Sequence, residues 1–152
     1  MDAQQAGEQI ERELLILTRH QEMASPRRLY GSEALERSAY VLLSRIEAQG
    51  PMSVADLVDA FGLAASTFNR QTAALLRDGL VERALDPNGG VARKFRITQK
   101  GTDALRADRG TVVDGLARVV TGWTSERLDR FIADLQQFNK DIERLTGRPW
   151  PR

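Results

Sequence analysis

The order of local signals between residues 53 and 101 constrains this chain more strongly than any other feature of its sequence. Two short segments with helical periodicity come first, and glycine follows each of them. Two short alternating segments around a turn rich in proline and glycine come next, and the cap of a further helix closes the stretch. Capping residues and hydrophobic spacing identify each of these elements in turn.

The first of the two helices is predicted to begin near Val54. Ser53 and Asp56 form an S-x-x-D start, in which the serine hydroxyl can accept a hydrogen bond from a backbone N–H three residues on. Gly62 can adopt the left-handed conformation that ends a helix. Between these limits apolar residues recur at helical steps, at Val54, Leu57, Val58 and Phe61.

The second helix, between Leu63 and Asp78-Gly79, is predicted to have an apolar and a polar face. Its apolar positions are Phe68, Thr72, Leu75 and Leu76. Its opposite face carries Ser66, Arg70, Ala73 and Arg77, flanked by Thr67 and Asn69. Small residues with hydroxyls, an amide and arginines allow a helix to approach a major groove and contact base edges or phosphates. For an isolated helix, an ordinary solvated face is the alternative interpretation.

A β-hairpin is predicted after this helix, over residues 80–85 and 91–97. The intervening residues 86–90 contain Pro, Asn-Gly and Gly, which suit a tight hairpin turn. In the second strand the apolar side chains Val91, Phe95 and Ile97 share one face, and Lys94 and Arg96 share the other. Beside a recognition helix, such a hairpin is a wing that can follow the phosphate backbone or enter the minor groove. A plain solvated hairpin is the alternative.

This order of elements is that of a winged helix-turn-helix, which is a DNA-binding arrangement. We therefore expect a mostly α-helical protein with a small β-hairpin wing. The predicted contacts with double-stranded DNA come from polar and basic side chains of the second helix and the wing: Ser66, Thr67, Asn69, Arg70, Arg77, Arg93, Lys94 and Arg96.

The distribution of charge agrees with this interpretation. The formal net charge is only +1, but residues 66–110 hold nine Lys or Arg against five Asp or Glu, a local net of +4, and the rest of the chain has a net of −3. DNA affinity depends on how many phosphates a local basic patch neutralises. The positive charge of residues 66–110 is therefore what a DNA-binding unit needs, although the net charge of the chain is small.

The chain resembles the MarR-type winged-helix transcriptional regulators, in motif order over residues 53–101 and more loosely in helix order over residues 8–145. The motifs that carry the resemblance are Ala55-Asp56-Leu57, Ser66-Thr67-x-x-Arg70, Leu75-x-x-x-Gly79-Leu80-Val81-x-Arg83 and Ile97-Thr98-x-x-Gly101. Two positions depart from the family pattern. Ala64-Ala65 stands where a polar cap commonly precedes the recognition helix. Val91 stands where the wing tip of the family often has an arginine, and Arg93, two residues later, can take the place of that arginine.

Flanking helices are predicted over residues 8–22, 32–49 and 99–121, and from Thr124 or Ser125 onwards. Proline at Ser25-Pro26 ends the first. The last has an apolar seam that needs a partner surface. The resemblance implies that the first and last helices form a homodimer interface, through Ile10, Leu14, Leu17, Leu128, Phe131, Leu135, Phe138 and Ile142. An intramolecular bundle in a monomer is the alternative.

These expectations divide the chain into five segments. We expect a disordered N-terminus at residues 1–7 and a winged helix-turn-helix DNA-binding domain at residues 32–101. The helical dimerisation region consists of residues 8–31 and 102–146, and residues 147–152 form a C-terminal tail. The resemblance further implies a repressor on a pseudopalindromic operator, released by a small-molecule effector such as an aromatic acid. No firm effector pocket follows from the sequence, although segments that carry His20, Arg27, Arg28 and Tyr40 line the expected cleft. Trp123 is expected to fill a helix junction.

Composition excludes several other classes. The 152-residue chain has no cysteine, which excludes disulfides, thiolate metal sites and cysteine redox sensing. It has no apolar run near the roughly 18 residues of a membrane span, and its first residues do not resemble a signal peptide. We therefore expect a cytoplasmic protein without cofactor. One histidine and no phosphate loop disfavour an enzyme, and a winged-helix protein–protein adaptor without DNA binding is the remaining alternative.

Overall fold

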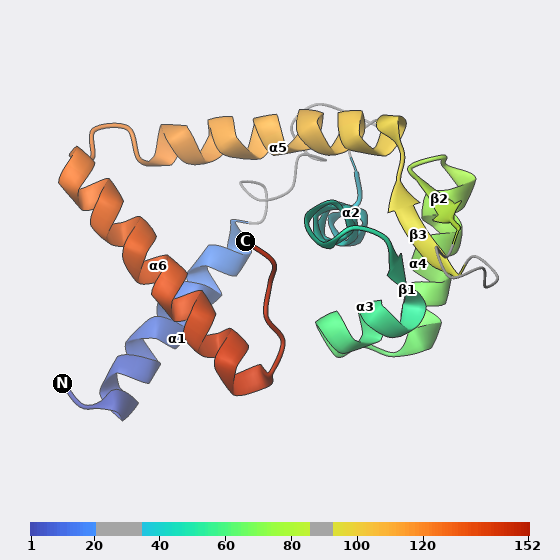
Figure 1. Ribbon diagram of the computed structural model, residues 1–152. Coiled ribbons are helices and arrows are strands. Elements are labelled where there is room, and N and C mark those ends of the chain that lie inside the picture. The colour runs from blue at the N-terminus through green and yellow to red at the C-terminus, as the bar shows by residue number, and fades with distance from the viewer. Residues whose placement is uncertain (21–34, 86–92) are drawn as a thin grey trace.

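The computed structural model describes residues 1–20, 35–85 and 93–152, and shows a mostly helical chain with a small antiparallel sheet, as predicted (Figure 1). Its elements are α1 (Ala3–Arg19), α2 (Arg37–Gln49), β1 (Met52–Ser53), α3 (Val54–Phe61), α4 (Ala65–Arg77), β2 (Val81–Ala84), β3 (Lys94–Ile97), α5 (Gln99–Val119) and α6 (Ser125–Thr146). Several expected features lie outside the described residues: the helix end at Ser25-Pro26, Arg27, Arg28, the hairpin turn at residues 86–90, and Val91.

The elements from α2 to β3 form the winged unit, which holds the core of the molecule. Side chains from α2, α3, α4, the sheet and the first half of α5 meet in one cluster. Its fully buried members are Leu43, Ile46, Met52, Leu57, Phe68 and Leu105. In Figure 1 this unit lies at one end of the long helix α5, and α6 lies at the other end. The start of α6 is therefore separated from the winged unit by the length of α5, whereas its last residue, Thr146, borders the same pocket as Val58 and Asp59 of α3.

Helix α3 forms where its local signals place it. The hydroxyl of Ser53 accepts a hydrogen bond from the backbone N–H of Asp56 at 3.1 Å, and the Asp56 carboxylate accepts one from the N–H of Ser53 at 2.8 Å. Gly62 ends the helix with φ +69°, a left-handed conformation that favours glycine. The predicted start and end of this helix are confirmed.

The sheet has one strand more than the predicted hairpin. Strands β2 and β3 pair antiparallel, with Val81 opposite Ile97, and β1 adds to the other edge of β3, with Met52 opposite Phe95. Two residues are too few to show the alternation from which a strand is predicted. The burial of Met52 against the core keeps β1 in place.

The junction between the sheet and α5 depends on Thr98 and Gly101. The Thr98 hydroxyl donates to the carbonyl oxygen of Gly79 at 2.7 Å and accepts from the N–H of Gly101 at 3.0 Å. Gly101 lies so close to the backbone of Leu80 that a Cβ at this position would overlap the Leu80 carbonyl oxygen. A residue without a side chain is therefore required where α5 begins.

Two predicted boundaries at the N-terminal side were wrong. Helix α1 begins at Ala3, so residues 3–7 are helical rather than disordered, because Asp2 and Gln5 form a reciprocal capping box. Helix α2 begins at Arg37, and not at residue 32. The N–H of Leu35 instead donates to the buried carboxylate of Asp108 on α5, at 2.7 Å.

Burial also affects the pKa of the Asp108 carboxylate. Loss of solvent raises the pKa of Asp108 above its ordinary value, and the hydrogen bond from Leu35 partly opposes this shift. The contact ties the start of α2 to the middle of α5. It therefore contributes to the orientation of α5 on the winged unit.

Helix α6 has the predicted cap and an exposed apolar stripe. The Thr124 hydroxyl accepts a hydrogen bond from the backbone N–H of Arg127 at 3.3 Å. Within α6, all of which is described, no residue is buried, and the same holds for α1. In the part of the chain that the structure describes, no helix is long and apolar enough to cross a membrane.

We predict opposite effects of alanine at two glycines of α5. Gly101→Ala should lower the free energy of unfolding by about 1–3 kcal/mol, because the new methyl group collides with the Leu80 backbone. Gly110→Ala is the matched control. Nothing lies within 4 Å of a Cβ at this helical position, so the change should raise the free energy of unfolding by about 0.5–1 kcal/mol. Urea denaturation measures the free energy of unfolding of both variants. Equal changes in the two would show that the Leu80 backbone does not exclude a side chain at residue 101.

Candidate nucleic-acid interface

Burial of one face fixes how α4 presents the other. Phe68, Thr72 and Leu75 point into the core and are almost fully buried. The Thr72 hydroxyl donates to the carbonyl oxygen of Phe68, at 2.7 Å, so this buried polar group is satisfied within the helix. The predicted outward residues Ser66, Asn69, Arg70, Ala73 and Arg77 are exposed, and Thr67 is half-buried. The two predicted faces of this helix are confirmed.

The start of α4 lacks a side-chain cap. Ala64 has the extended backbone of an N-cap residue, with φ −65° and ψ 145°, but its methyl group cannot accept a hydrogen bond. The N–H of Thr67 reaches the Ala64 carbonyl oxygen at 3.0 Å. The exposed first turn of α4 therefore has backbone donors that no side chain caps.

The two arginines of α4 differ in their surroundings. Arg77 forms an ion pair of 3.2 Å with the adjacent Asp78, and both side chains are more than half exposed. Arg70 has no ion-pair partner among the described residues. Exposed pairs contribute at most about 1 kcal/mol, so Arg77 remains available to an anion of higher charge density. Arg70 is available without breaking such a pair.

The cations of the wing differ in whether they have an ion-pair partner among the described residues. Arg93 and Lys94 are exposed and form no ion pair within the described ranges 1–20, 35–85 and 93–152. Arg96 binds Glu82, its cross-strand neighbour, through contacts of 2.7 and 3.1 Å. The guanidinium of Arg83 lies 5.5 Å from the ring centre of Phe95. The cationic side of the strand is therefore present, but Arg96 is engaged by a carboxylate.

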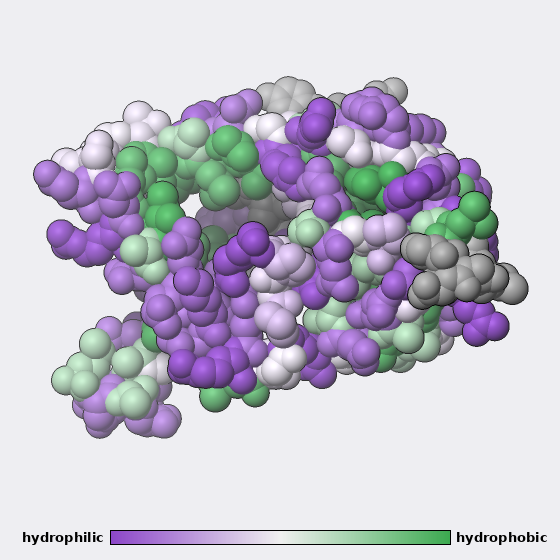
Figure 2. Space-filling view, viewed as in Figure 1, coloured by the Kyte–Doolittle hydropathy of each residue, from purple (hydrophilic) through white to green (hydrophobic). Residues whose placement is uncertain are grey.

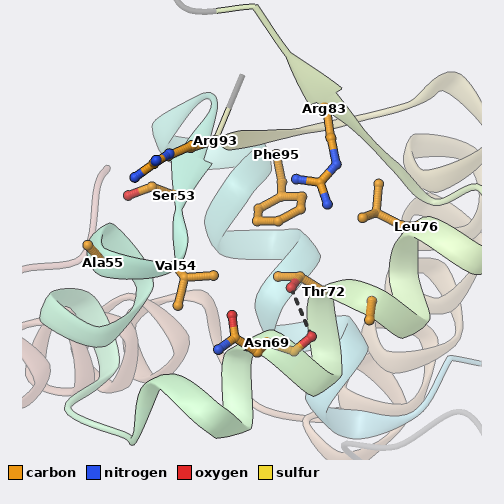
Figure 3. A pocket seen from close by; sticks show the side chains of 10 residues that line it. Ser53, Val54, Ala55, Asn69, Thr72, Leu76, Arg83, Arg93 and Phe95 are labelled. Carbon is orange, nitrogen blue, oxygen red and sulfur yellow. Dashed lines mark hydrogen bonds between the residues drawn. The ribbon is translucent and has the colours of Figure 1, made fainter. Parts of the chain in front are cut away.

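A groove of about 480 Å³ joins the recognition helix to the wing (Figure 3). Asn69 and Thr72 contribute from α4, Arg83, Arg93 and Phe95 from the wing, and Ser53, Val54 and Ala55 from the start of α3. The structure thus brings Asn69 and Arg93, two of the predicted contact residues, to one groove. The sequence prediction of the site did not include Ser53, Ala55 or Arg83. Local signals for a helix cap and a strand do not show which groove these residues border in the folded chain.

The predicted dimerisation residues are accessible on two helices. Hydrophobic side chains of α1 and α6 are about half exposed, including Leu14, Phe131 and Leu135 at 45%, 50% and 47%. The other predicted interface residues, Ile10, Leu17, Phe138 and Ile142, are 36–63% exposed, whereas Leu128 is half-buried. Figure 2 shows hydrophobic side chains gathered along α5 and the start of α6, around a hollow between these helices. Such exposed apolar surface marks an interaction site.

The suggested effector residues do not form one site in the described residues. His20 is exposed at the end of α1, whereas Tyr40 is half-buried on α2 and interacts with Arg109 of α5. Trp123 packs edge-on against Phe131, at 5.5 Å between ring centres, with the guanidinium of Arg127 4.0 Å from its own ring centre. Trp123 therefore fills the α5–α6 junction, as expected. Among the described residues, no cluster of acidic and histidine side chains suits a metal ion.

These features define a winged helix-turn-helix protein with a polar recognition helix and exposed apolar flanking helices. The sequence model of the MarR family matches residues 35–89. An uncharacterized HTH-type transcriptional regulator, YxaD of Bacillus subtilis (strain 168), is 36% identical over 106 residues, which are 70% of this chain and 74% of that protein. The chain belongs to the MarR family of transcriptional regulators.

Solved structures show the same fold. A MarR family protein from Bacillus stearothermophilus has a TM-score of 0.75 at 20% identity, over 93% of this chain and 98% of that one. Bordetella bronchiseptica BpsR, described as regulated in its DNA binding by 6-hydroxynicotinic acid, has a TM-score of 0.60 at 18% identity, over 84% and 96% of the two chains. At these identities the similarity establishes the architecture.

We predict that a polar cap will stabilise the start of α4. In Ala64→Ser the hydroxyl can accept from a first-turn N–H, and the free energy of unfolding should rise by about 1 kcal/mol. Ala65→Ser is the matched control, since residue 65 already has helical geometry and lies past the cap position. Urea denaturation of both variants checks this, and an equal change in both would show that the extended backbone of Ala64 is not a cap position.

Proposed function

We propose that this chain is a sequence-specific repressor that binds double-stranded DNA as a homodimer on a pseudopalindromic operator. The observation that carries the proposal is the exposed polar face of α4 beside Arg93 and Lys94 of the wing, which have no ion-pair partner among the described residues. Membership of a family of transcriptional regulators supports the same role. The proposed partner also implies a cytoplasmic location, with access to the chromosome.

The proposed contacts divide into two kinds. Ser66, Thr67, Asn69 and Arg70 belong to the reading face of α4, where side chains meet base edges in the major groove. Arg93 and Lys94 of the wing, together with Arg77, contact phosphates. Arg96 is the weaker member of the proposed set, because a phosphate must first replace Glu82 as its partner.

The homodimer is proposed from the apolar surface of α1 and α6. Neither helix buries a residue within the single chain, and the stripe of α6 extends over most of its 22 residues. One recognition helix reads only a few base pairs, whereas two helices related by a twofold axis read half-sites about 10 base pairs apart. Dimerisation therefore covers the apolar stripe and supplies the second reading helix. In this proposal the dimerisation region is residues 8–31 and 102–146, and the DNA-binding domain is residues 32–101.

We further propose that a small aromatic acid releases the protein from its operator. The hollow between α5 and α6 has apolar side chains at its edge (Figure 2), and the structurally similar BpsR responds to such an acid. Release requires only that the acid bind more tightly to a conformation with the wrong spacing of recognition helices than to the DNA-bound one. No catalytic step enters this mechanism.

The first test separates contacts with base edges from contacts with phosphates. Random duplexes bound by the purified protein are selected to obtain an operator, and Arg70→Ala and Lys94→Ala are compared on it. Arg70→Ala should reduce discrimination among sequences by about 1–3 kcal/mol, because it removes a base contact. Lys94→Ala should weaken all sequences alike and reduce the salt slope by about 1, because it removes a phosphate contact.

Arg118→Ala is the charge control for this test. It removes the same charge as Arg70→Ala, but at the end of α5 remote from the winged unit (Figure 1). It should leave sequence preference unchanged. Affinity that does not vary with salt would contradict the proposal and favour a protein–protein adaptor, and unchanged discrimination in Arg70→Ala would show that the reading face is wrongly assigned.

We predict that Leu135→Glu will convert the dimer to a monomer. Two symmetry-related carboxylates would be buried in the apolar seam, and like charges facing each other across an interface cost several kilocalories per mole. Ala133→Glu is the control, since residue 133 is exposed and lies about 200° around the helix from residue 135. Light scattering after size exclusion gives the mass. A wild-type monomer, or an Ala133→Glu monomer beside a Leu135→Glu dimer, would contradict the proposed interface.

A further inference from the structure

The chain after α6 turns back towards the winged unit. Gly147 ends α6 with φ +68°, and the N–H of Arg148 bonds to the carbonyl oxygen of Glu143 at 3.1 Å. From this reversal the C-terminal residues run back beside α6, on the side that faces the winged unit (Figure 1). We call residues 147–152 the C-terminal segment. The sequence predicts only a tail here.

The C-terminal segment packs on the winged unit through Trp150. The Trp150 ring lies edge-on to Phe61 of α3, with ring centres 6.1 Å apart. Phe61 in turn contacts Phe68 of α4, at 5.7 Å between ring centres. A continuous row of three aromatic rings therefore connects the C-terminal segment to the buried face of the recognition helix.

A buried arginine supports the same contact. Arg45 of α2 is only 6% exposed, and its guanidinium lies 5.0 Å from the ring centre of Trp150. Its Nη1 donates to the carbonyl oxygen of Pro149 at 3.1 Å, and its Nε donates to Gln49 at 2.9 Å. Burial lowers the pKa of Arg45, and the charge of Glu143 opposes that shift. A desolvated guanidinium needs such partners, and the C-terminal segment supplies two of them.

The end of the C-terminal segment is fixed to α6. The guanidinium of Arg152 contacts both carboxylate oxygens of Glu143, at 2.6 and 2.9 Å. This bond lowers the pKa of Glu143 and raises that of Arg152. The C-terminal segment is thereby held to α6 at its last residue and to the winged unit at Trp150. It forms a short brace between the two.

The position of this brace matters because α5 is a long lever. Its 21 residues span about 32 Å at about 1.5 Å per residue. Its first half packs in the core and moves with the winged unit, so the lever is the part beyond Asp108, about 17 Å long. A tilt of about 10° over this length displaces the winged unit by about 3 Å, which is close to the roughly 3.4 Å between successive base pairs. A second connection between α6 and the winged unit therefore limits the variation in recognition-helix spacing.

We propose that Trp150 and Arg45 are positioning residues, which fix the recognition helix relative to α6 and so set the half-site spacing that the dimer accepts. This inference rests on the proposed DNA-binding function. It assigns to the C-terminal segment a role in operator choice without any contact with DNA. A contact that merely stabilised the fold would lower affinity for all spacings alike.

The test compares operators whose half-sites are one or two base pairs closer or farther apart than in the selected operator. Trp150→Ala should reduce the preference for the selected spacing about tenfold, while affinity for a single half-site stays unchanged. Trp150→Phe should restore the preference, because phenylalanine keeps an aromatic ring against Phe61 and Arg45. Retained spacing preference in Trp150→Ala, or an equal loss of affinity on every operator, would overturn the proposal.

A second measurement decides the proposal without DNA. The chain has no cysteine, so spin labels attached through Ala55→Cys on α3 and Ala133→Cys on α6, both exposed positions, report one distance. Labelled chains are diluted with unlabelled wild type to isolate the distance within one subunit. Trp150→Ala should broaden the distance distribution, and Trp150→Phe should not. An unchanged width in Trp150→Ala would overturn the positioning role, whereas a wild type that binds no DNA would refute the proposed function alone.

Discussion

Burial of one face of α4 is the interaction on which the rest of this structure depends. Phe68 and Leu75 lie in the core shared with α2, α3 and the sheet, and they fix the rotation of the helix about its axis. Because residues on opposite sides of a helix turn together, this contact also places Arg70 and Ser66 in solvent. The polar face can serve recognition only while the apolar face remains buried behind it.

Electrostatics on the outer surface refine this picture. The structure distinguishes cations without an ion-pair partner among the described residues, such as Arg70 and Lys94, from Arg96, which Glu82 engages. An exposed pair is worth at most about 1 kcal/mol, so Glu82 weakens a phosphate contact of Arg96 rather than preventing it. Net charge alone does not reveal such pairing, because it counts both groups equally wherever they lie.

Local signals predicted the helices of the winged unit well, and they failed where long-range contacts decide. Helix α3 follows its own cap and its terminal glycine, and α6 follows its Thr124 cap. Strand β1 was missed because its pairing with β3 is distant in sequence. The start of α2 was misplaced, since the hydrogen bond from Leu35 to Asp108 spans 73 residues. The capping box at Asp2 is a local signal, and the prediction of a disordered N-terminus does not take it into account.

By itself the sequence determined the order of the helices and of the two hairpin strands, the two faces of α4 and the apolar stripes of α1 and α6, because these features depend on residues within a few turns of one another. Only the tertiary structure decided which cations are paired, which groove Asn69 and Arg93 share, and where the C-terminal segment lies. Arg45 meets Pro149 across 104 residues of chain. Contacts of this kind arise from the packing of complete elements, and no spacing within the sequence encodes them.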